Sequence, residues 1–169
     1  MQELKIITLT HYLMKGMKVA PWEETFENLV AFCRKMAQKF APLGFGLKLR
    51  QVELDDFCEE NMAASNMVSI SCEALGVAET PIENLLFIEP NFTDCADCVT
   101  PDGFTFPVRT FTTLSGQTSQ SLPEEFFMEA VLKVIFRGQN CDCSCENCAS
   151  GCENEKLARD LGQHAHCHH

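Results

Sequence analysis

The sequence predicts an α/β protein in which a central mixed sheet is flanked by helices, and three observations carry that prediction. Residues 21–40 and 121–137 place apolar side chains at three- and four-residue spacing, which is typical of amphipathic helices. Other stretches are rich in β-branched residues or alternate with period two, which is typical of strands. The two kinds of segment alternate along the chain, an order that favours α/β architecture.

The first half of the chain supplies most of these elements. A change of apolar phase between Leu49 and Val52 predicts a bulge or bend in the second strand. Trp22 is expected in the core at the start of the long helix, and Cys33 is expected to be a small buried hydrophobe on its apolar face. In chain order we expect a strand at 4–9, a loop at 11–20, a helix at 21–40, a strand at 45–54, a short helix at 56–64, a strand at 66–72 and a helical turn from 81.

The second half is predicted to end in a hairpin and a helix. Residues 87–101 are expected to form a polar loop that holds Cys95-Ala-Asp-Cys98. Residues 108–114 and 117–121 flank a Ser-Gly turn and predict a hairpin. Ser121 is placed to cap the last helix, whose apolar spacing stops before Gly138. We therefore expect a folded domain at 1–137 and a separate tail at 138–169, which is possibly disordered without metal.

Composition narrows the classes of function. The formal net charge of −11 argues against nucleic acid and anionic membranes as partners and favours cations, metal ions included. No run approaches the roughly 20 apolar residues of a spanning helix, and the N-terminus lacks a signal pattern, so we expect a cytoplasmic protein. Clustered cysteines in a reducing cytosol are more typical of metal ligands or reactive thiols than of structural disulfides.

The C-terminal tail concentrates metal-binding side chains. It holds six of the eleven cysteines and four of the five histidines, with Cys-x-Cys and Cys-x-x-Cys spacings that suit zinc. Zinc is the first expectation; copper(I), nickel or an iron–sulfur cluster remain alternatives. The predicted ligands in the tail are Cys141, Cys143, Cys145, Cys148, Cys152, Cys167, His164, His166, His168 and His169.

Cys95 and Cys98 form a second candidate site. The pair could bind a metal or exchange disulfides, and it could also serve as a structural clip for a long loop. Together with two tail thiols it would make a four-cysteine centre. Cys58 and Cys72 are expected to be structural. His11 could face the same region, although a surface histidine is the simpler interpretation.

The order of elements resembles the thioredoxin-like fold, and more closely the DUF2703 family, whose function is unassigned. The likeness is carried by Glu24-Thr-Phe-Glu-Asn-Leu29, by Ala64-Ser-Asn-Met-Val-Ser-Ile70, and by the stretch from Val108 to Glu125. Thioredoxin-like enzymes carry Cys-x-x-Cys at the start of their first helix, where this chain has no cysteine. Pro107 resembles the cis-proline that flanks the active site in that fold, while a trans proline opening a strand is the alternative.

Two hypotheses of function follow. The first is binding of a thiophilic metal ion by the clustered cysteines and histidines, for sequestration, delivery or sensing. The alternative is a thiol–disulfide oxidoreductase that uses Cys95 and Cys98 as its catalytic pair. Whether the protein is an enzyme stays open at this point, as does a scaffold role in which the tail is an incidental extension.

Overall fold

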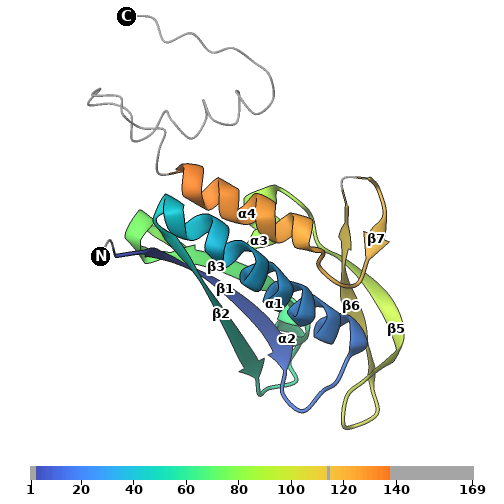
Figure 1. Cartoon of the computed structure of the whole chain (residues 1–169). Helices are drawn as coiled ribbons and strands as arrows, with labels where there is room; N and C mark the ends of the chain where they lie inside the picture. The colour runs from blue at the N-terminus through green and yellow to red at the C-terminus, as the bar shows by residue number, and fades with distance from the viewer. Residues whose placement is uncertain (1–2, 114, 138–169) are drawn as a thin grey trace, which may run out of the picture. The chain divides into compact units, whose positions relative to one another are not determined.

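The computed structural model describes residues 3–113 and 115–137, and it is a mixed α/β structure whose sheets are flanked by helices (Figure 1). One compact unit ends at Val134 and contains both sheets. The strands are β1 (Lys5–Met14), β2 (Phe45–Leu54), β3 (Val68–Cys72), β4 (Val77–Pro81), β5 (Asn91–Val99), β6 (Thr105–Thr112) and β7 (Thr118–Ser119). The α-helices are α1 (Ala20–Phe40), α2 (Glu59–Ala64), α3 (Ile82–Leu86) and α4 (Glu124–Arg137).

The larger sheet has four strands in the order β2-β1-β3-β4. β1 and β2 are parallel, whereas β3 is antiparallel to β1 and β4 is antiparallel to β3. The β1–β2 ladder runs without a register shift from Lys5↔Phe45 to Met14↔Leu54. The predicted bulge in β2 is therefore wrong. β2 is an edge strand whose residues are mostly exposed or partly buried. The change of apolar phase therefore needs no extra residue in the strand.

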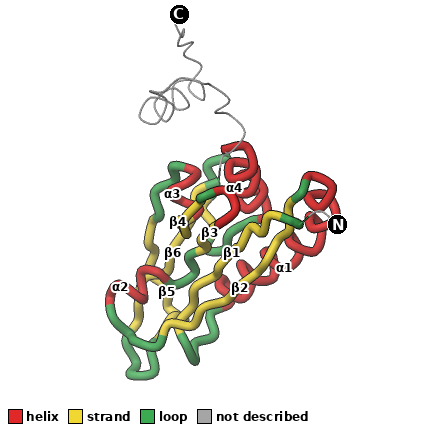
Figure 2. Tube along the Cα trace, turned by 90° about the vertical axis from the view of Figure 1, so that its left-hand side faces the viewer, coloured by secondary structure: helices red, strands yellow, loops and turns green. Residues whose placement is uncertain are grey.

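Helices lie on both sides of this sheet. α1 and α4 lie side by side over one face, where the Phe32 and Phe127 rings are 5.8 Å apart (Figure 1). The segment before α4 is fixed to α1 by two hydrogen bonds of 3.0 Å: Asn28 donates to the carbonyl of Leu122, and the Leu122 N–H donates to Thr25 Oγ1. Figure 2 shows α2 on the opposite side of the strands from α1, whereas α3 adjoins α4, whose Lys133 donates to the carbonyl of Leu85 at 3.4 Å. The predicted helix at 21–40 is thus confirmed to within one residue.

Three local predictions fail. Residues 11–14 are not loop, because β1 continues to Met14 along its parallel partner. Val77–Pro81 is a strand, β4, where the sequence pattern predicted no regular element before the helical turn from 81. Residues 91–99 are not a polar loop but strand β5, which pairs with β6 and so belongs to a second sheet of order β5-β6-β7. The predicted hairpin before the last helix is present as β6 and β7.

A buried ion pair connects strand β6 of the second sheet to helix α3, and its arginine also bonds to α2. Arg109 on β6 donates from Nη1 to Glu83 Oε1 of α3 at 2.7 Å, and from Nη2 at 2.5 Å to the carbonyl oxygen of Ala63 in α2. The two charged side chains are only 9% and 2% exposed. Arg109 Nε and Glu83 Oε2 lack a hydrogen-bond partner within the described residues. The direct contact between the two side chains and the bond to Ala63 must therefore offset the cost of burying two charges.

Candidate functional site

Cys95 and Cys98 are joined by a disulfide inside an irregular part of β5. Asp94 pairs with Pro107 and Val99 pairs with Thr105, so four residues of β5 oppose one residue of β6. In a regular strand, residues three apart would be about 10 Å apart and would point to opposite faces. The bulge brings the two Cα atoms to 5.2 Å, within the range a disulfide spans. The irregular ladder is thus what makes the bond possible.

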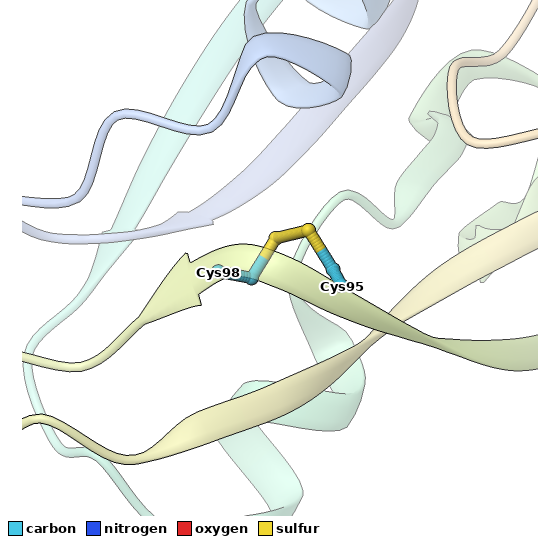
Figure 3. Close-up of a disulfide and its surroundings, with 2 residues drawn as sticks. All are labelled: Cys95 and Cys98. Atoms are coloured by element: carbon cyan, nitrogen blue, oxygen red, sulfur yellow. A yellow bond between two sulfur atoms is a disulfide. The ribbon is translucent and has the colours of Figure 1, made fainter.

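The disulfide faces the beginning of α1. Figure 3 shows both sulfur atoms projecting from β5 toward the segment that joins β1 to α1. Cys98 belongs to a buried cluster with Met14, Val19, Trp22, Phe106 and Val108, and Cys95 packs against the same cluster. The Trp22 ring lies 6.0 Å from that of Phe106. The indole N–H of Trp22 has no hydrogen-bond partner within the described residues.

The two cysteines differ in accessibility. Cys98 is 1% exposed, whereas Cys95 is only partly buried. An incoming thiol or disulfide can therefore reach Cys95 more readily than Cys98. This arrangement of one approachable and one protected sulfur permits an ordered exchange, in which the protected thiol closes the bond after the approachable one has reacted.

His11 is buried, so its interpretation as a surface residue is wrong. Its side chain is 1% exposed, and its Nε2 lies 3.0 Å from Asn66 Oδ1. Burial lowers the pKa of His11 below its ordinary value of 6.5, while the hydrogen bond that its ring donates to Asn66 opposes that shift. The imidazole is accordingly neutral near pH 7. The odd-numbered apolar positions Ile7 and Leu9 precede it on β1, and continuing that alternation would have predicted its burial.

The cysteines outside this pair occupy three different environments. Cys72 is buried, as expected for a structural residue, but Cys58 is exposed at the start of α2, which contradicts the expected structural role. Cys33 is half-buried on α1, less enclosed than expected. Burial raises the pKa of its thiol to about 11, which keeps it protonated at neutral pH.

The peptide bond before Pro107 is trans, as in the alternative interpretation, so the likeness to a cis-proline does not hold. The described residues contain no cis peptide bond, and Pro107 lies within β6, opposite Asp94. Its position borders the irregular part of the ladder, where a residue without an N–H is tolerated. It therefore borders the bulge that carries the cysteine pair.

The predicted metal ligands of the tail all lie outside the described residues. These are Cys141, Cys143, Cys145, Cys148, Cys152, His164, His166, Cys167, His168 and His169. In the described part of the chain, no group of three or more His, Cys, Asp or Glu side chains is arranged to hold a metal ion. Cys95 and Cys98 alone would supply two sulfur ligands, so a four-cysteine centre needs donors from elsewhere.

The residues beside the disulfide, Met17, Val19 and Trp22, were not predicted as part of a site. They lie more than seventy positions away from Cys95 in the sequence, and no local pattern links the two segments. None of the helices in residues 3–113 and 115–137 is long and apolar enough to cross a bilayer.

These features define a class: a mixed α/β protein that carries a cysteine pair next to the start of its first long helix. The chain matches the family model described as a domain of unknown function, DUF2703, over residues 6–131. Because the match covers well over half of the chain, the protein belongs to that family. No curated protein and no solved structure matches it.

Proposed function

We propose that the protein is a thiol–disulfide oxidoreductase whose reactive pair is Cys95 and Cys98. The observation that carries the proposal is the Cys-x-x-Cys disulfide in the β5 bulge, with one protected and one approachable sulfur. The neighbouring Trp22 and Phe106 exclude water from Cys98 and so limit its reaction to partners that arrive through Cys95.

In the proposed reaction, the reduced protein transfers two electrons to a substrate disulfide. The Cys95 thiolate attacks one substrate sulfur, which forms a mixed disulfide and releases the other substrate sulfur as a thiolate. The Cys98 thiolate then attacks Cys95 Sγ, closing the Cys95–Cys98 bond and releasing the second substrate thiolate. A small thiol such as glutathione, or a dithiol protein, reduces the protein again and is itself oxidised.

The arrangement of the strands supports a thioredoxin-like fold as part of this proposal. β1, α1 and β2 form a parallel βαβ unit, and β3 and β4 complete the sheet in the order β2-β1-β3-β4. Thioredoxin-like enzymes hold their cysteines at the start of the helix that corresponds to α1. Here the sulfurs come from β5 of the second sheet and reach the same end of that helix.

The proposal is tested by equilibrating the full-length protein in glutathione buffers of graded potential. We expect Cys95 and Cys98 to convert between dithiol and disulfide as one two-electron couple, measured by trapping free thiols and mapping the peptide that contains them. Trp22 is the only tryptophan, and its emission should follow the same titration because it shares a cluster with Cys98. Catalysed reduction of a disulfide-bonded protein such as insulin should fall at least a hundredfold in Cys95→Ser.

The matched control is Cys58→Ser, which removes an exposed free thiol that is not part of the cluster around Cys98 and should leave activity unchanged. Cys98→Ser should trap the mixed disulfide on Cys95 and stop turnover. Activity that survives both Cys95→Ser and Cys98→Ser would overturn the proposal. So would a pair that stays oxidised across the whole range of glutathione potentials.

A second candidate function is binding of a thiophilic metal ion by the tail, and the spacing of its cysteines favours it. Cys145-x-x-Cys148 and the Cys-x-Cys pairs from Cys141 are typical of thiolate metal sites. We expect the reduced full-length protein to bind zinc, and replacing the six tail cysteines with serine should remove most of that metal in elemental analysis. Replacing Cys33, Cys58 and Cys72 with serine is the control and should leave it. Metal content that is absent from the native protein, or unchanged by the tail substitutions, would contradict this function.

A further inference from the structure

A cleft of about 570 Å³ lies where β1 and β2 end against the first turns of α1. That volume is typical of sites for small molecules or for one or two side chains of a peptide. Crevices at the carboxyl ends of parallel strands are a common place for ligands in open α/β sheets. The cleft is distinct from the disulfide, although Trp22, Val19 and Met17 belong to the walls of both.

The inner wall of the cleft is aromatic. The Phe26 ring stacks on the His11 ring, with 6.0 Å between centroids and 21° between planes. Trp22 lies in the same lining, and Leu13 and Met17 add aliphatic surface. Aromatic faces of this kind bind alkyl chains and attract cations.

His11 presents a hydrogen-bond acceptor at the base of the cleft. The Asn66 amide donates from Nδ2 to the carbonyl oxygen of Gln120 at 2.8 Å, which turns its Oδ1 toward His11 Nε2. An oxygen can only accept, so Nε2 of the neutral imidazole carries the proton and Nδ1 is unprotonated. Nδ1 faces the Gln51 amide nitrogen at 3.5 Å, a long contact that a better donor can replace.

The rim of the cleft carries an excess of negative charge. Glu23 and Glu27 on α1 and Glu53 on β2 line it, against the single cation Lys18. Glu23 and Glu27 are exposed, and neither has an ion-pair partner within the described residues. They stand four positions apart on one helix, where like charges repel. Glu53 acts at longer range on Lys15, whose pKa is raised first by its bond to Asp55 and to a smaller extent by Glu53.

We propose that this cleft binds an alkylammonium ligand. Its charged group lies among Glu23, Glu27 and Glu53 and donates to His11 Nδ1, while its carbon chain lies on Phe26 and Trp22. The negative charge of the rim carboxylates repels anionic ligands. Among the described residues, no group of three or more His, Cys, Asp or Glu side chains is arranged to hold a metal ion in this cleft. The proposal is independent of the redox chemistry of Cys95 and Cys98.

The test is a calorimetric titration of the full-length protein with putrescine, a four-carbon diamine, and with a blocked Ala-Lys-Ala tripeptide. The first represents free amines, and the second represents the lysine side chain of a peptide. The amide oxygens of the tripeptide could also accept from the Trp22 N–H, which has no partner among the described residues. We expect binding of at least one of them, weakening as salt screens the rim. Tighter binding of putrescine would identify a free amine as the source of the ligand, and tighter binding of the tripeptide would identify a peptide.

The substitution Glu23→Gln with Glu27→Gln should weaken binding roughly fivefold to tenfold, since each exposed carboxylate contributes modestly. The matched control is Glu24→Gln, which changes a neighbouring exposed carboxylate outside the lining and should change affinity less than about twofold. Both substitutions lie on the exposed side of α1, so the fold is retained. Absence of binding by both probes, equal binding of 1,4-butanediol, or tighter binding of succinate would each overturn the proposal.

Discussion

The variant Arg109→Met is expected to lose about 3–5 kcal/mol of unfolding free energy, because it leaves the Glu83 carboxylate buried without its partner. Glu83 is 2% exposed and makes its ion pair with Arg109 at 2.7 Å. The substitution also removes the hydrogen bond to the carbonyl of Ala63 and so releases β6 from α2. Chemical denaturation at fixed redox potential measures the change.

The double variant Arg109→Met with Glu83→Met should recover most of that loss, since a buried pair replaced by apolar side chains costs little. The exposed pair Lys15–Asp55, at 2.9 Å, supplies the control. Lys15→Met should leave the denaturation midpoint nearly unchanged, because an exposed ion pair contributes little to stability. A single variant Arg109→Met as stable as the native protein would show that the buried pair contributes nothing.

The second large effect is expected at Asn66, whose side chain is fully buried and whose φ is +63°. Asn66→Ala leaves the His11 N–H and the Gln120 carbonyl without partners, each costing about 1–3 kcal/mol. The left-handed backbone adds strain for alanine but not for glycine. We therefore expect a loss of about 3–5 kcal/mol in thermal or chemical unfolding.

Asn66→Gly separates the two causes. It loses the same hydrogen bonds but relieves the backbone, so it should be more stable than Asn66→Ala by about 1 kcal/mol. Alanine that matched or exceeded glycine would mean that the backbone at this position is not held in the left-handed region. A loss below about 1 kcal/mol in both variants would mean that the hydrogen bonds of Asn66 are replaced by other groups.

Elements with a strong local pattern could be predicted from the sequence, and α1 is the best example. Its apolar positions, its acidic first turn and the proline that follows its end fix both boundaries. β5 could not be predicted in the same way. Four of its residues lie in a bulge, so period-two alternation is absent from its sequence. The strand conformation depends on hydrogen bonding to β6, which the residues of β5 alone do not indicate.

The candidate site was also predictable only in part. The Cys-x-x-Cys spacing of Cys95 and Cys98 was visible in the sequence, and the pair indeed bonds within the chain. Its position beside Trp22 depends on how the second sheet meets α1, which no local pattern records. His11 was misjudged because β1 was ended too early. The alternation of β1 through Leu13 places this histidine on the covered face.

The place of β2 at the rim of the four-stranded sheet has a consequence for contacts between copies of the protein. Its ten residues leave one side of the backbone without a neighbouring strand in the described part of the chain, which offers a template for further pairing. Lys48, Arg50 and Glu53 project from it and are exposed. Charged side chains on an edge strand disfavour further pairing, so the sequence of β2 guards the protein against edge-to-edge aggregation.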